Sequence, residues 1–425
     1  MLPPVLLTTP QNCGTLAAAR CLGALGYPVW MASDAGLNVP AMRSRFVARR
    51  LECPPLSQPD ALLAWLVDFG RKNPGAILYP TSDDFAWFQA VHADALAPHY
   101  KLYAPSVKVL DALLDKDSMN ALCKRVGLET PPSASPRTDA ELEEAARTLP
   151  LPVLIKQRTQ LFSKNRDKGV VVHDREELVA KAREYRTHSD RVADVSAELP
   201  EATLPVLQTY YAEGMDQSLQ VSGFIDETGE LFVTRAVAKI LQRPRRMGLS
   251  LCLEDEPVPP ALADGIRALC REAGYFGVFE LEFLRVGGRH LLIDFNPRYY
   301  HYMGFCIARG MPLPVFTALA ARGERPALEV AVRQAVAAQG TGPKAFCYRS
   351  QLEEMLFLQG LARTMSPAEV LHWIRWYRTH RREMNDPMDV PGDRLPHFLD
   401  LANSFAHHAR HPRSFLRKIV LDRDA

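Results

Sequence analysis

The stretch GVFELEFLRVGGRHLLIDFNPR, residues 277–298, decides the fold of this chain. Two runs of alternating side chains, 279–284 and 290–295, flank Gly287-Gly288. Runs of this kind on either side of a glycine pair predict a β-hairpin.

Side chains alternate between the two faces of a strand, so the hairpin is expected to have one polar and one apolar face. The polar face carries Glu280, Glu282, Asp294 and Asn296, and the apolar face carries Leu281, Phe283, Ile293 and Phe295.

The register of the hairpin decides which polar side chains meet. A two-residue Gly-Gly turn would place Glu282 opposite Ile293, whereas a three-residue loop at 287–289 would place Glu282 opposite Asp294. We expect the longer loop, because it gathers Glu282, Asp294 and Asn296 on one surface.

Carboxylates clustered on a strand face repel one another, so a cation should offset their charge. Glu282, Asp294 and Asn296 supply hard oxygen ligands that suit Mg²⁺, with phosphate and water completing the octahedron. Arg298 adds a bidentate donor for a phosphate or a carboxylate. The alternative is an ordinary hairpin with a solvated outer face, and the spacing alone does not choose between the two.

This segment resembles the metal-binding end of the ATP-grasp superfamily, where an acidic residue in one strand is followed by E-x-N-P-R in the next. Here residues 294–298 read DFNPR, so Asp294 stands in place of the usual Glu. With the other motifs below, the resemblance covers roughly residues 5–310. It implies an ATP-grasp domain of two α+β subdomains, about 106–205 and 206–328.

Composition limits the remaining function classes. A chain of 425 residues predicts two or three domains, and 47% apolar with 24% charged residues is typical of a globular protein. The net charge of +2 argues against a nucleic-acid partner, and no apolar run is long enough for a membrane span. Eight cysteines without CxxC pairs predict reduced thiols in a cytoplasmic protein, and the N-terminus lacks the basic segment of a signal peptide.

Residues 1–105 alternate strands and helices, which predicts an N-terminal parallel βαβ domain and an overall α/β and α+β class. The expected strands are 4–8, 27–32 and 76–79, and the expected helices are 14–26 and 61–71. The segment TTPQNCGT, residues 8–15, lacks G-x-G-x-x-G, so NAD is not expected.

Ser82 and Asp83 follow a strand end, where open α/β sheets place ligand groups. They resemble the P-T-S-D motif of amine-ligating ATP-grasp enzymes, which implies a substrate-binding role. The alternative for at least one of them is to cap the next helix.

Three segments resemble nucleotide-binding motifs of the superfamily. Asp115-Lys116 precedes GLETP at 127–131, which implies that Lys116 contacts phosphates. The apolar run LPVLIK, 151–156, ends in Lys156, which requires an anionic partner. In the superfamily this lysine bridges the adenine and the α-phosphate.

The third segment, VLQTYYAEGMD at 206–216, resembles the hinge strand that reads the adenine edge. Gln208 and Tyr210 match that pattern. Asp216 stands at the position of the acid that holds the ribose, and Glu213 is its rival.

Two basic segments complete the resemblance. The segment TQLFSKNRDKG, 159–169, stands at the place of a phosphate-covering loop, but it has basic residues where that loop usually has glycines. Its side-chain charge would then hold the phosphates, and the alternative is a solvated basic turn. RAVAKILQRPRRMG, 235–248, resembles a segment of the amine-ligating branch. There Lys239 would reach the γ-phosphate, and Arg243 or Arg245 would hold a carboxylate substrate; the alternative is a solvated face.

Residues 329–425 are expected to form a helical region outside the ATP-grasp core. Ser366-Pro367-Ala368-Glu369 is a capping box with proline at N1, and 395–406 has an amphipathic pattern. Six of the twelve histidines lie here without the spacing of a metal site. We expect this region to pack on the core, to close the cleft or to form a subunit interface.

Together the resemblance implies an ATP- and Mg²⁺-dependent ligase, with Mn²⁺ as an alternative metal. A carboxylate would be activated as an acyl phosphate and joined to an amine, with Lys239 and Arg298 as catalytic residues. The expected partners are small-molecule acids and amines, and a second copy of the chain is an option. The alternatives are a small-molecule kinase and a nucleotide-binding protein without turnover.

Overall fold

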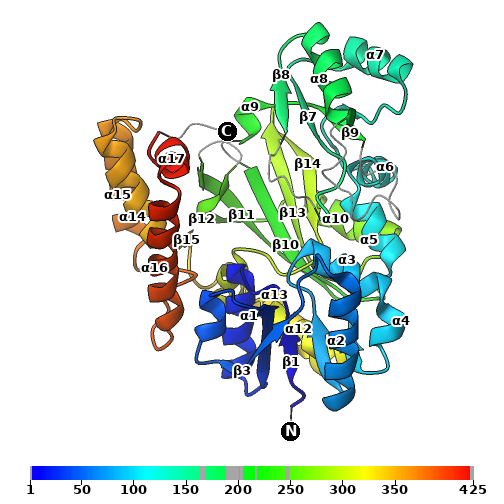
Figure 1. The fold of residues 1–425 in the computed structure, drawn as a ribbon, viewed down its shortest axis with the longest axis vertical. Coiled ribbons are helices and arrows are strands. Elements are labelled where there is room, and N and C mark those ends of the chain that lie inside the picture. Colours follow the sequence, from blue (N-terminus) through cyan, green and yellow to red (C-terminus); the bar gives the residue numbers. More distant parts are fainter. Residues whose placement is uncertain are drawn as a thin grey trace.

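The structure is a computed structural model, in which three sheets organise the chain (Figure 1). The residues that it describes are 2–162, 169–187, 201, 204–215, 218–244 and 248–421.

The N-terminal sheet is parallel, as predicted, with the strand order β3-β2-β1-β4-β5. Its strands are β1 (Val5–Leu7), β2 (Val29–Asp34), β3 (Val47–Cys53), β4 (Ala76–Tyr79) and β5 (Tyr100–Leu102). Its helices are α1 (Cys13–Ala24), η1 (Pro40–Arg43), α2 (Pro59–Lys72), α3 (Asp83–Val91) and α4 (Ala93–Leu96). The sequence analysis missed β3, because this edge strand buries only its first and last residues and so has no clear alternation.

The smaller of the other two sheets is antiparallel and has the order β6-β9-β7-β8. Its strands are β6 (Ser133–Ala134), β7 (Val153–Gln157), β8 (Val170–Val172) and β9 (Pro205–Thr209). The helices α7 (Asp139–Thr148) and α8 (Arg175–Thr187) cover it, and α5 (Val107–Leu114) and α6 (Lys116–Val126) precede it. Because β9 pairs with β6 and β7, this sheet extends past the expected subdomain boundary near residue 205.

The large sheet has the order β14-β13-β10-β11-β12-β15-β16. Its strands are β10 (Ser218–Ile225), β11 (Phe232–Arg243), β12 (Leu249–Glu256), β13 (Gly277–Val286), β14 (Arg289–Asn296), β15 (Ala345–Cys347) and β16 (Met384–Asn385). The associated helices are α9 (Ala212–Met215), α10 (Pro260–Ala273), α11 (Met303–Ala308), α12 (Leu313–Ala321) and α13 (Arg325–Ala337). Helix α10 buries Leu262, Ile266 and Leu269 against the apolar face of β13.

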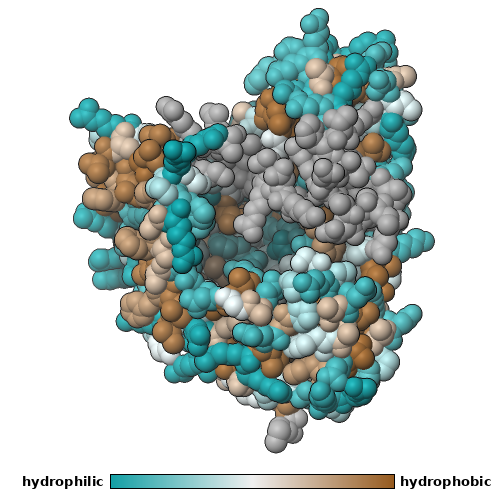
Figure 2. Space-filling view, viewed as in Figure 1, coloured by the Kyte–Doolittle hydropathy of each residue, from teal (hydrophilic) through white to brown (hydrophobic). Residues whose placement is uncertain are grey.

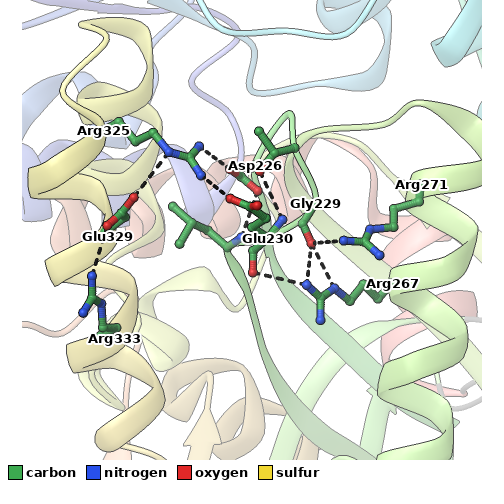
Figure 3. A network of polar contacts seen from close by, with 10 residues as sticks. Asp226, Gly229, Glu230, Arg267, Arg271, Arg325, Glu329 and Arg333 are labelled. Carbon is green, nitrogen blue, oxygen red and sulfur yellow. Dashed lines mark hydrogen bonds and ion pairs between the residues drawn. The ribbon is translucent and has the colours of Figure 1, made fainter.

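Arginines fix the turn between β10 and β11 (Figure 3). The Gly229 carbonyl accepts hydrogen bonds from Arg267 at 2.9 and 2.7 Å and from Arg271 at 3.1 Å, both on α10. On the other side, Arg325 of α13 donates to Asp226 at 2.7 Å. The hairpin that carries Lys239 is therefore held at its turn by two helices.

The region after residue 330 differs from the expectation, because it also contributes β15 and β16 to the large sheet. These strands have three and two residues, too few to show alternation in a sequence. The remaining elements are α14 (Arg349–Leu361), α15 (Pro367–His380), α16 (Leu395–Arg410), α17 (Pro412–Phe415) and η4 (Leu416–Val420). The capping box of α15 forms as predicted, with Ser366 and Glu369 each accepting the other's backbone N–H.

The structure also describes the cysteines and the apolar character of the helices. Six of the eight cysteines are buried, and none forms a disulfide. Among the residues that the structure describes, no helix has the length and apolar character needed to cross a membrane.

Candidate active site

A cavity of about 330 Å³ lies where the small sheet, the large sheet and the N-terminal domain meet. Figure 2 shows the molecule hollowed in this region, with hydrophilic side chains on the floor of the hollow. The predicted residues that line the cavity are Lys116, Lys156, Gln208, Tyr210, Lys239, Glu282, Asp294, Asn296 and Arg298. The structure therefore brings together residues that are up to 182 positions apart in the sequence, from Lys116 to Arg298.

The β13–β14 hairpin places Glu282 opposite Asp294, and Glu280 opposite Asn296. The predicted pairing is confirmed, but the predicted three-residue loop is wrong. Val286 pairs with Arg289, so Gly287-Gly288 forms a two-residue turn, with φ of 55° and 78°.

A β-bulge restores the pairing that the short turn would have lost. Phe283 pairs with Leu292 and Glu282 with Asp294, which leaves Ile293 as the extra residue of β14. Ile293 packs with Leu284 on the cavity side instead of joining Phe295 in the core. The same bulge therefore makes the predicted face of Ile293 wrong and the predicted pairing of Glu282 with Asp294 right.

Each of the two predicted carboxylates has a lysine partner. Lys116 donates to Asp294, and Lys239 donates to Glu282, which also accepts from the Ser218 hydroxyl at 3.0 Å. Lys116 is the first residue of α6, whose N-cap Asp115 accepts from the Ser118 amide at 2.8 Å. The cap fixes the helix start, and with it the position of the Lys116 ammonium.

Glu280 is a member of this cluster that the sequence analysis left out of the site. Its carboxylate is 4% exposed and accepts from the Asn296 amide at 2.6 Å. Burial first, and then the neighbouring Glu282 and Asp294, raise its pKa to about 8. Its position on the same strand face as Glu282 was the signal that could have identified it.

The donor set fits a hard divalent cation. Three carboxylates and one amide share a strand face, and one oxygen of Glu280 has no hydrogen-bond partner among the described residues. Over the same residues, no three Asp, Glu, His or Cys side chains already converge as a metal site, since lysines engage Glu282 and Asp294. A cation would therefore bind in exchange for the two ammonium groups.

Lys156 has a neutral partner. Its ammonium donates to the Gln208 side-chain oxygen at 2.9 Å, across the β7–β9 pair. Burial first, and then the positive charge of Lys116, lower the pKa of Lys156 to about 7. An anion entering the cavity would find here a cation that no carboxylate has neutralised by direct contact.

Arg298 joins the large sheet to the N-terminal domain. It donates two hydrogen bonds to Asp83, both of 3.0 Å, and one of 2.7 Å to the Asn296 side-chain oxygen. Ser82 caps α3 by accepting from the Phe85 amide, as the capping alternative predicted. Asp83 therefore reaches the site through Arg298, and Ser82 has a structural role.

The remaining predicted residues are not part of the cavity wall that the structure describes. Glu213 lies exposed on α9, and Arg243 forms an ion pair of 2.8 Å with Glu354 of α14. Asp216, Arg245 and the basic part of the 159–169 segment lie outside the described residues.

Sequence analysis also missed one wall of the cavity. Tyr300, His301 and Tyr302, which follow shortly after Arg298, also line it. Gly14 of α1 lies against this segment so closely that a Cβ there would stand 2.2 Å from the Tyr300 carbonyl oxygen. Their position next to the DFNPR motif was the only sequence signal.

Comparisons with known proteins agree with this architecture. No family model matches the chain. The arginine-specific large chain of carbamoyl phosphate synthase from the chloroplast of Arabidopsis thaliana is 21% identical over 276 residues, which are 63% of this chain. The match spans only 22% of that relative's length.

Solved structures of low sequence identity have a similar fold. The biotin carboxylase domain of Hydrogenobacter thermophilus 2-oxoglutarate carboxylase aligns with a TM-score of 0.60 and 16% identity, over 76% of this chain and 70% of that one. L-Amino acid ligase from Bacillus licheniformis aligns with a TM-score of 0.57 and 15% identity, over 76% and 75% of the two chains. These neighbours are ATP-grasp ligases, and the element order and sheet topology of the aligned part show that this chain has the ATP-grasp fold.

Proposed function

We propose that this protein is an ATP- and Mg²⁺-dependent ligase that activates a carboxylate as an acyl phosphate and joins it to an amine, releasing ADP and phosphate. The observation that carries the proposal is the convergence of Lys116, Lys156 and Lys239 on the acidic face of one hairpin. The neighbours support it by what they bind or do: the biotin carboxylase domain was solved with MgADP and bicarbonate, and another neighbour is an L-amino acid ligase.

The three lysines would neutralise the phosphates of the nucleotide. Catalysis of phosphoryl transfer consists mainly of positioning and charge neutralisation, for which buried ammonium groups are suited. Lys116 and Lys239 are now held by carboxylates, so phosphate binding would exchange one anionic partner for another. Lys156 would need no such exchange.

Glu280, Glu282, Asp294 and Asn296 would hold Mg²⁺, which neutralises charge on the phosphate oxygens when bound. Glu280 must lose its proton to take part, because burial keeps its pKa near 8. Nearby, Arg298 is held in place by Asp83 and Asn296, with its guanidinium on the cavity wall. Its fixed charge would stabilise the oxyanion that forms when an amine attacks the acyl phosphate.

The test is ADP release across a matrix of carboxylic acids and amines, starting with the common amino acids. Glu282→Gln should lower the rate at least a hundredfold, because it removes a charge at the phosphates. Glu272→Gln is the matched control, since Glu272 pairs with Arg125 on the exposed side of α10. Release that survives in Glu282→Gln would contradict the proposal.

Hydroxylamine separates a ligase from a kinase. A ligase should convert the correct acid to a hydroxamate, since hydroxylamine attacks an acyl phosphate. A kinase would release ADP without forming a hydroxamate. A nucleotide-binding protein without turnover would release no ADP with any pair.

A further inference from the structure

Helix α16 exposes its apolar side and buries its polar side. Leu395, Phe398, Leu401 and Phe405 recur at helical spacing and are 53%, 60%, 41% and 78% exposed. We call these four residues the α16 stripe. Single exposed apolar residues are common on protein surfaces, but a continuous stripe marks an interaction site.

The polar side of α16 provides its contacts with the rest of the molecule. Asp400 accepts from the Tyr348 hydroxyl at 3.0 Å, and Asn403 donates to the Asn38 carbonyl at 2.9 Å. Further along the helix, His408 lies 3.2 Å from Glu354. The contacts of Asp400 and Asn403, on the side of the helix away from the α16 stripe, therefore fix the outward direction of the stripe, while His408 lies beside it.

Other elements of the C-terminal region also expose apolar side chains. Leu416 is 52% exposed on η4, and Phe357 and Leu361 are 69% and 75% exposed on α14. Gln359 of α14 donates to the Ile419 carbonyl of η4 at 2.9 Å, so these two elements are neighbours. Figure 2 shows apolar side chains gathered over the part of the molecule that α14, α15 and α16 form.

The charge at the C-terminal end of the α16 stripe is positive. Arg410 and Arg413 follow the stripe and are exposed, whereas Arg394, which precedes it, is exposed and pairs with Asp389 at 3.0 Å. Between Leu395 and Leu421 the sequence has one acidic residue, Asp400, which faces inward to Tyr348. Phenylalanine and leucine on one side of a helix with arginines beside them are typical of helices that lie in a membrane surface.

We propose that the α16 stripe docks this protein on the surface of an anionic lipid bilayer. The stripe would enter the boundary between headgroups and acyl chains, and the arginines would contact the negatively charged headgroups.

Charge favours a bilayer over a second copy of the chain. A twofold axis through the stripe would bring the Arg394 end of one copy towards the Arg410 end of the other, or each end towards itself. The second arrangement brings Arg410 and Arg413 of the two copies together, which opposes association. In the first arrangement Asp389 already offsets the charge of Arg394, so the measurement of self-association below decides it. An anionic bilayer is complementary to the same surface.

The experiment is co-sedimentation of the full chain with vesicles of phosphatidylcholine, alone or mixed with phosphatidylglycerol. We expect binding to the mixed vesicles, weakened by salt, and at most weak binding to phosphatidylcholine alone. Phe398→Ser with Phe405→Ser should weaken binding to the mixed vesicles at least tenfold. Arg410→Gln with Arg413→Gln should weaken it roughly thirtyfold, at about 1 kcal/mol for each arginine near a charged surface.

Val330→Ser with Val336→Ser is the matched control, because both valines are exposed on α13 away from the stripe. This variant should bind as the wild type does, and all variants should keep the wild-type melting temperature because the altered side chains are exposed. Light scattering of the wild type and the phenylalanine variant reports self-association. The proposal is overturned if no vesicles bind, if the stripe and arginine variants bind unchanged, or if the wild type is a dimer that the phenylalanine variant dissociates.

Discussion

Lys156 is the residue whose protonation should report nucleotide binding most directly. Burial and Lys116 hold its pKa near 7, so at pH 8 most of the free protein carries this lysine neutral. Phosphate oxygens would favour the charged form and raise the pKa. We predict that Lys156 takes up close to one proton when MgADP binds at pH 8, while Glu280 releases about half of one, and that the contribution of Lys156 to the affinity falls as pH rises above 7, by up to tenfold for each unit.

Titration calorimetry in two buffers of different ionisation enthalpy measures this uptake. Lys156→Met should bind more weakly and should take up about one proton fewer than the wild type. Equal proton exchange by the two proteins would show that Lys156 does not meet the phosphates.

Glu280 gives a second prediction, on the stability of the fold. Its folded pKa of about 8 lies above the ordinary value of 4.5, so between these values the folded protein holds a proton that the unfolded chain has released. The stability that this group contributes is therefore complete below pH 4.5 and is lost as pH rises through 8. Glu280→Gln should be more stable than the wild type at pH 8 by roughly 4 kcal/mol, because glutamine stays neutral.

Urea unfolding at pH 6 and pH 8, without added metal, measures this difference. Glu272→Gln serves as the control at an exposed site and should follow the wild type at both values. The same Glu280→Gln protein should also lose stabilisation by Mg²⁺ with ADP. Parallel pH profiles for Glu280→Gln and the wild type would contradict the assigned pKa.

For single residues, the alternation of side chains in the strands and the order of the motifs predicted most of the residues that line the cavity. Spacing tells which strand face a side chain occupies, and that was enough for Glu282, Asp294 and Asn296. It does not tell how deeply a group is buried, so Glu280 was not included. Arg243 was assigned to a substrate because its partner, Glu354, lies more than a hundred residues away in a region without a recognisable motif.

Among the elements, the β13–β14 hairpin shows why a register was predicted correctly from an incorrect loop. The requirement that the acids share a face was sound, but a Gly-Gly pair is compatible with both loop lengths. The bulge at Ile293 depends on apolar packing against Leu284, Val286 and Tyr211. Tyr211 comes from another part of the chain, so this contact was not visible in the hairpin sequence.

The turn of the hairpin can be tested through Gly287, whose φ of 55° lies in the left-handed region. A β-branched residue is strained there, whereas asparagine adopts this conformation readily. We predict that Gly287→Val lowers the free energy of unfolding by roughly 1–2 kcal/mol and that Gly287→Asn changes it by less than about 0.5 kcal/mol. Nothing lies within 4 Å of a Cβ at this position, so a clash would not explain the difference. Urea unfolding of the three proteins measures it, and equal losses in both variants would argue against a two-residue turn.

In the whole molecule, ion pairs between distant parts of the chain surround the cavity. Arg298 with Asp83 ties the large sheet to the N-terminal domain, and Lys116 with Asp294 ties it to α6. On the far side, Arg243 at the end of β11 pairs with Glu354 of α14, which also contacts His408 of α16. The C-terminal helices are thus joined to the strand that carries Lys239 as well as to the sheet edge.

Glu354 therefore holds the C-terminal helices against the large sheet, and its neighbour Glu353 provides a matched comparison. The Arg243 side chain is only 8% exposed, so Glu354→Ala would leave a buried cation without its carboxylate. Glu353 is 63% exposed and lies 3.6 Å from Arg349, where a surface pair contributes little.

We predict a loss of about 3 kcal/mol in unfolding free energy for Glu354→Ala and less than about 0.5 kcal/mol for Glu353→Ala. In limited proteolysis, Glu354→Ala should also be cut first after residue 348, because α14 and α16 lose their shared anchor. Equal stability of the two variants would mean that Arg243 finds another partner, and that the C-terminal helices are held by β15 and by the contacts of Asp393 and Asp400 instead.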